Sequence, residues 1–180
     1  MTVIVNKHGE IIQTIYAPDD VVVLNTPENC VALPDPSNLN MYLDKGEWVD
    51  IPPQPSNGMV FDYTIKQWID PRTLDEIKAQ KWAEIKAQRD QLEFGSFEFE
   101  SNIYDSDQVS QSRIMGAAAA GIDQVWTLRD NTTVNLTASQ LQQLYAALQA
   151  HIASVHERGR IARQLIFEAE TKEQVEAVNL

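Results

Sequence analysis

The side chains that most often carry metal or nucleophilic chemistry are sparse in this sequence. The three histidines are His8, His151 and His156. The last two are five residues apart on one predicted helix, about 140° around it, so they cannot share a metal as an i,i+4 pair can. The only cysteine is Cys30, which excludes an intrachain disulfide and a multi-cysteine metal site. We therefore expect surface or rim positions for the histidines and no nucleophilic role for the thiol.

Asp105 and Asp107 are the acidic pair that most resembles the start of a metal-binding loop. An EF-hand loop with this start needs a Glu at its twelfth position, where Gly116 stands. The pair instead favours an N-cap for a helix beginning near Gln108, because carboxylates complement the positive end of a helix. No other carboxylate pair stands out. We predict no metal, no cofactor, no catalytic residue and no enzymatic activity.

A run of small residues over 115–121, MGAAAAG, is the nearest approach to a phosphate loop. It lacks the terminal Lys-Ser/Thr of such loops and precedes a predicted strand instead of following one. Its small side chains predict a helix that packs closely against a sheet or another helix. Asp130 and Asn131 predict a hairpin turn, since both tolerate the left-handed backbone.

The charge balance excludes two kinds of partner. The net charge is −12, from 26 acidic and 14 basic residues. Nucleic-acid binding needs clustered Lys and Arg, and the densest basic run, Arg158 to Arg163, lies beside Glu157. No apolar run approaches the roughly 18 residues that span a bilayer, and an anionic membrane would repel the chain. We expect neither nucleic acid nor membrane as a partner, no signal peptide, and synthesis in a reducing cytoplasm.

The first part of the chain has the pattern of strands. Apolar segments at 3–5 and 11–16 flank the turn residues 6–9, which predicts a hairpin. The apolar run 21–24 predicts a further strand. Three prolines then mark a loop-rich stretch over 27–36.

A weak repeat follows, MYLDKGEWVDIP and VFDYTIKQWIDP. The two copies predict two similar β-hairpins joined by the extended, Pro-rich linker 52–55. Trp48 and Trp68 hold matching places in the copies. Three roles are open to them: packing in a small core, contact with a protein partner, and stacking on a sugar.

Three capping boxes predict helix starts, because a Thr oxygen and a Glu or Gln three residues later satisfy free amides. They are at 73–76, 137–140 and 171–174. The first opens a helix over 74–92 that Gly95 ends, and its thin apolar stripe is typical of a bridging helix. The second opens the longest helix, 138–169.

The apolar positions of the long helix alternate by four and three residues over four heptads. This stripe can pack on the 74–92 helix in the same chain, or it can form a seam between subunits. Gly159 in the stripe permits close approach of another element. The stripe residues that we name as candidate interface residues, beside the two hairpin tryptophans, are Leu141, Tyr145, Leu148, Ile152, Val155 and Ile166.

These elements predict an α+β protein in three parts. Residues 1–72 form a β-rich docking module and residues 73–93 a bridging helix. Residues 94–180 form an α+β domain of two short hairpins, an Ala-rich helix and the long amphipathic helix.

Five short motifs follow one another in the second half of the chain: FGSFEF at 94–99, YDSD at 104–107, SQSRI at 110–114, WTLRDN at 126–131 and RQLI at 163–166. Through these motifs, the segment 89–169 resembles a domain found mainly in tailed-bacteriophage proteins, domain of unknown function family 4376. Ser101-Asn102 stands where this pattern has a Gly in the first hairpin turn. The part before it, 42–89, is loosely similar to tail-fibre assembly proteins.

The resemblance implies a non-enzymatic structural or adaptor protein of a bacteriophage virion, in the tail, baseplate or tail fibre. Its partners would be other tail or tail-fibre proteins, and it would be a homo-oligomer in the virion after synthesis in the host cytoplasm. The alternative is a tail-fibre assembly chaperone that binds the fibre during maturation. The family has no activity from which catalytic residues could be carried over.

Overall fold

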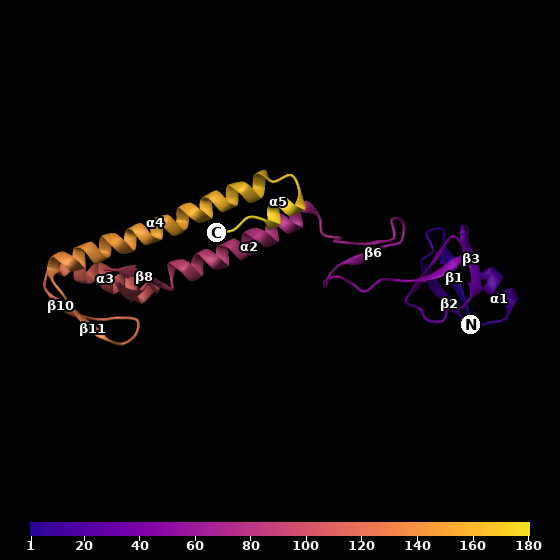
Figure 1. The fold of residues 1–180 in the computed structure, drawn as a ribbon, viewed down its shortest axis with the longest axis horizontal. Coiled ribbons are helices and arrows are strands. Elements are labelled where there is room, and N and C mark those ends of the chain that lie inside the picture. Colours follow the sequence, from indigo (N-terminus) through magenta and orange to yellow (C-terminus); the bar gives the residue numbers. More distant parts are fainter. The chain divides into compact units, whose positions relative to one another are not determined.

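The computed structural model describes all 180 residues, which divide into two units, Met1–Pro71 and Arg72–Leu180. Helices and several small antiparallel hairpins occur together, so the predicted α+β class is confirmed. Figure 1 shows these elements along the chain. None of the helices is both long and apolar enough to cross a bilayer.

The first unit is built on an antiparallel sheet of three strands in the order β2-β1-β3. The middle strand β1 (Thr2–Asn6) pairs with β2 (Ile11–Ile15) and with β3 (Cys30–Pro34). Val3, Ile4 and Val5 of β1 are fully buried. Burial of successive residues places this strand in the interior, since alternate side chains point to opposite faces of the sheet.

Two predictions for the first unit were wrong. The segment 21–24 belongs to a helix, α1 (Asp19–Leu24), because Pro18 and two first-turn aspartates start a helical turn. The stretch 27–36 holds the strand β3, which pairs with β1 in the register Asn6 to Cys30. That pairing joins distant residues, so local turn signals could not reveal it.

The two hairpins predicted from the repeat are present. The first is β4 (Met41–Asp44) with β5 (Glu47–Asp50), and the second is β6 (Val60–Asp62) with β7 (Gln67–Ile69). The Leu43 amide donates to the Gly9 carbonyl at 2.9 Å. A Cβ on Gly9, whose φ is +84°, would lie 1.9 Å from the Leu43 carbonyl oxygen, so only glycine permits this approach.

The second unit confirms the helices and hairpins predicted for it. All three capping boxes form, with Thr73, Thr137 and Thr171 as N-caps. The elements in chain order are α2 (Leu74–Glu93), β8 (Ser96–Phe99), β9 (Asn102–Asp105), α3 (Gln108–Ala120), β10 (Gln124–Thr127), β11 (Thr133–Leu136), α4 (Ala138–Glu168) and α5 (Lys172–Glu176).

The long helix α4 runs alongside α2 and α3 and contributes to two separate cores (Figure 1). Its first half packs with the hairpins β8-β9 and β10-β11 and with α3. Its second half packs with α2 and α5. Within the chain, the second half of the stripe packs on α2, as the intrachain prediction has it, whereas the first half packs on α3 and the two hairpins. The α4 residues buried in these cores are Leu141, Leu144, Leu148, Ala162 and Ile166.

The end of α2 is tied to the middle of α4 by polar contacts. His151 Nε2 lies 2.9 Å from the Leu92 carbonyl oxygen, and His156 Nε2 lies 3.0 Å from a Glu93 carboxylate oxygen. Gly159 faces the Arg89 side chain, whose Cδ would be 3.2 Å from a Cβ at that position. The close approach expected at Gly159 is thus made by α2.

Two glycine substitutions test this packing. Gly116→Ala should stabilise the chain by about 0.5–1 kcal/mol, because alanine favours the helix and a Cβ at Gly116 meets nothing within 4 Å. Gly159→Leu should instead destabilise it by about 1–3 kcal/mol through overpacking against Arg89. Urea unfolding followed by far-ultraviolet circular dichroism measures both. A Gly159→Leu variant as stable as Gly116→Ala would contradict the α2–α4 contact.

Candidate functional site

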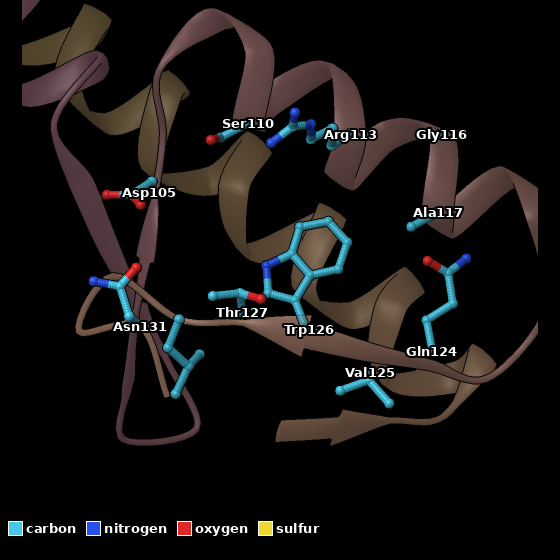
Figure 2. Close-up of a pocket in the computed structure, with 11 residues that line it drawn as sticks. Asp105, Ser110, Arg113, Gly116, Ala117, Gln124, Val125, Trp126, Thr127 and Asn131 are labelled. Carbon is cyan, nitrogen blue, oxygen red and sulfur yellow. The ribbon is translucent and has the colours of Figure 1, made fainter. Parts of the chain in front are cut away.

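A surface groove of about 540 Å³ lies between α3 and β10, beside the end of β9. We call it the α3–β10 groove (Figure 2). Its volume lies in the range of ligand-sized cavities. The residues that line it include Asp105, Arg113, Gly116, Val125, Trp126 and Thr127.

One wall of the groove is a face of α3. Ser110, Arg113 and Ala117 recur at three- and four-residue spacing, which places them on one side of a helix. Gly116 and Ala117, which follow Arg113 along α3, have small side chains or none, so α3 projects little into the groove at these positions. Ile114 and Ala118 are buried, and α3 packs along α4.

The other wall is β10, with the half-buried Trp126 as its largest side chain. Figure 2 shows the indole standing between β10 and α3, with Arg113 near its upper edge. The indole also packs against the first core. The ring therefore gives the groove one broad, fixed apolar surface.

The charges around the groove leave one cation without a partner. Asp105 lies 4.0 Å from the Arg129 guanidinium, and Asp107 is engaged at the start of α3. Arg113 is exposed and forms no hydrogen bond or ion pair with the chain. In a chain of net charge −12, this unpaired guanidinium has the chemistry that attracts carboxylates and phosphates.

Asp107 is the N-cap of α3, as predicted. Its carboxylate accepts from the Val109 and Ser110 amides at 2.9 and 3.1 Å and from the Ser110 hydroxyl. The Ser110 hydroxyl, and then the backbone amides, lower the pKa of Asp107 below its ordinary value of 3.8. The chain places no group of three or more His, Cys, Asp or Glu side chains where they could hold a metal ion.

The candidate interface residues of α4 lie inside the second unit. Leu141, Leu148, Val155 and Ile166 are buried. Tyr145 and Ile152 are half-buried and pack against the first core. Only Tyr145 and Ile152 of these six residues keep part of their side-chain surface exposed.

The two hairpin tryptophans do not have matching environments. Trp68 stands opposite Phe61, with ring centroids 5.5 Å apart, and its indole N–H donates to the Pro52 carbonyl at 2.9 Å. Trp48 stands opposite Leu43. Both are half-buried. Trp68 belongs to an aromatic cluster, whereas Trp48 lies on the other face of its hairpin from Tyr42.

Arg113 is the groove residue that sequence reasoning missed as a candidate. It was part of the SQSRI motif, but nothing in its neighbourhood along the chain marks it as unpaired. Its face of α3 becomes recognisable only when the helix is placed against α4 and β10. Trp126 could be identified only as one of four tryptophans.

Two buried hydroxyls near the groove have no hydrogen-bond partner. They belong to Tyr104, which is 1% exposed, and to the fully buried Ser106. Burial raises the pKa of Tyr104. Both flank Asp105 in sequence, where β9 leads into α3.

The fold of the second unit is an α+β domain of helices and small hairpins with a surface groove. Residues 76–179 match the family described as a domain of unknown function (DUF4376), so the chain belongs to this family. The match confirms the resemblance seen over 89–169 and extends it over most of α2. No curated protein and no solved structure matches the chain.

The unpartnered hydroxyl of Tyr104 gives a stability prediction. Tyr104→Phe should leave the free energy of unfolding within about 0.5 kcal/mol of the original value or raise it, because no hydrogen bond is lost. Tyr104→Ala should cost roughly 3–5 kcal/mol, since a large buried ring is removed. Urea titration compares the two. A loss above about 1 kcal/mol in the Phe variant would mean that the hydroxyl has a bonding partner.

The Asp107 cap gives a pH prediction. Asp107→Ala should cost about 1 kcal/mol at pH 7. Because the folded state lowers the pKa of this carboxyl, its stabilisation is present above the unfolded pKa and is lost as pH falls through the folded pKa. The gap between the original chain and Asp107→Ala should therefore narrow below about pH 4.

The matched control for this titration is the pair Asp107→Asn and Asp107→Ala. Asparagine caps without a charge, and neither residue titrates, so their difference should stay constant with pH. Urea unfolding between pH 3 and pH 7 measures both gaps. A constant gap between the original chain and Asp107→Ala would contradict the charged cap.

Proposed function

We propose that the chain is a non-enzymatic adaptor in the tail, baseplate or tail fibre of a tailed bacteriophage, acting through protein contacts. The observation that carries the proposal is the ordered series of motifs from Phe94 to Ile166 and its resemblance to a domain of phage proteins. In the structure these motifs lie in one unit, in β8, β9, α3, β10 and α4.

Exposed apolar side chains support a role in protein contacts. On α4, Ile161, Leu165 and Phe167 are about half exposed. In the first unit, Tyr16 and Leu24 are more than four-fifths exposed. Large exposed apolar side chains can contribute to protein interfaces. Each unit therefore has candidate contact residues of its own, separate from the buried α4 stripe.

Two contact surfaces on one small chain suit an adaptor between neighbouring proteins. Repeated weak contacts add up when subunits are held at high effective concentration, and symmetric assembly repeats each contact. We propose other tail or tail-fibre proteins as partners, a homo-oligomeric state in the virion, and synthesis in the host cytoplasm before assembly.

The second candidate function is a tail-fibre assembly chaperone. It rests on the loose similarity of residues 42–89 to tail-fibre assembly proteins, a segment that includes the hairpins β4-β5 and β6-β7. A chaperone would bind the fibre during maturation and would not need a fixed copy number in every particle.

Mass spectrometry of purified particles tests the proposal. Virions released by the strain that encodes the chain should contain it at a constant ratio to the major tail protein after gradient purification. A host cytoplasmic protein of similar abundance in the lysate serves as the control for carry-over. Absence from the particles would overturn the structural role. Presence only in fibre assembly intermediates, or only at fibre tips, would favour the chaperone.

A further inference from the structure

The backbone of β10 has a free edge in the α3–β10 groove. β10 pairs with β11 alone, in the register Trp126 to Val134. The Leu128 amide donates to the Thr132 carbonyl at 2.8 Å. In an antiparallel pair, hydrogen-bonded and non-hydrogen-bonded positions alternate. Because Leu128 occupies a hydrogen-bonded position, Trp126, two residues earlier, also bonds to β11. Val125 and Thr127 occupy the positions in between, so their backbone amides and carbonyls point away from β11.

These backbone groups have no partner in the chain. Neither Val125 nor Thr127 takes part in a hydrogen bond outside the hairpin, and both residues line the groove. Their spacing is that of two successive bonding positions in an antiparallel or parallel ladder. A chain in extended conformation could pair with both, which is the geometry of strand addition at a sheet edge.

The α3 wall adds a charged side chain, and the β10 wall adds the aromatic ring of Trp126. Arg113 is unpaired; of the nearby carboxylates, Asp105 lies 4.0 Å from Arg129 and Asp107 accepts from the Ser110 hydroxyl. An acidic side chain of an added strand would therefore meet one free guanidinium. The Trp126 indole offers a surface for an apolar side chain of the same strand.

We propose that the α3–β10 groove binds an extended segment of a protein partner, which adds as a strand to the free edge of β10 and places an Asp or Glu against Arg113. The inference rests on the proposed adaptor role, since it names the chemistry of one of its contacts. The backbone of Val125 and Thr127 supplies affinity, and Arg113 with Trp126 selects the side chains.

A display library of random ten-residue peptides on yeast, sorted with the fluorescent full chain, tests the proposal. Enriched peptides should carry an acidic residue between β-favouring residues. Fluorescence polarisation of the synthetic peptides then gives their Kd for the chain. The same library is also sorted with the fluorescent Val125→Pro variant. If the original chain enriches no peptide more strongly than this variant does, the proposal is overturned.

The key variant is Val125→Pro, compared with Val125→Ala. Proline at position 125 removes the backbone N–H that faces the free edge of β10, and no hydrogen bond to β11 is lost. Alanine shortens the side chain but keeps this N–H. We expect Val125→Pro and Arg113→Gln each to weaken peptide binding by about tenfold or more, and Val125→Ala by less than about threefold. Equal binding by Val125→Pro and Val125→Ala would overturn the strand pairing.

Circular dichroism must show that Val125→Pro is folded. If it unfolds, the original chain is tested with peptides whose alternate amides are N-methylated. One of the two methylation registers should bind at least about tenfold more weakly, and binding unchanged in both registers would overturn the pairing.

The molar mass of the full chain in solution, measured by light scattering, tells whether the free edge of β10 binds a second copy of the chain or a different protein. A dimer of the full chain that Val125→Pro dissociates would place a second copy on the edge, and would overturn the proposed partner. The peptide assay tests the groove, whereas mass spectrometry of virions tests the adaptor role. Because the two measurements are independent, failure of one proposal can be distinguished from failure of the other.

Discussion

The apolar stripe of α4 is covered by different partners along its length. The helix has 31 residues, roughly 47 Å at the usual rise, which is longer than one small core can cover. Its first half is buried by α3 and two hairpins, and its second half by α2 and α5. Because each half needs its own cover, the chain must place α2 back along α4, and α3 must turn its apolar side toward the same helix.

The need to cover α4 also determines which polar groups remain without a partner in the chain. Ile114 and Ala118 face the interior while α3 packs on α4, so Arg113 and Gly116 stand on the side of the helix that faces β10. The hairpin β10-β11 has only two strands, hence one edge of β10 is unpaired. The groove is thus a consequence of how α4 is covered, and it combines a free cation with free backbone groups.

Local chemistry was predictable, and long-range pairing was not. The capping boxes at Thr73, Thr137 and Thr171 and the cap at Asp107 each depend on residues within three positions, and all were predicted correctly. The strand β3 depends on its register with β1, for which the sequence carries no local mark. The run 21–24 was ambiguous by pattern alone, because a short apolar run suits a strand or a helix.

The candidate interface residues of α4 show a second limit of prediction from sequence. A heptad stripe records that a helix face is covered, and it does not record by which chain. Leu141 and Ile166 are covered within the unit, so their pattern was explained by folding itself. In the proposed adaptor role, contacts with other proteins would use groups that folding leaves unsatisfied or exposed. Arg113 and the outer backbone of Val125 and Thr127 are such groups, and unlike a hydrophobic stripe they specify the charge and the conformation of what can bind.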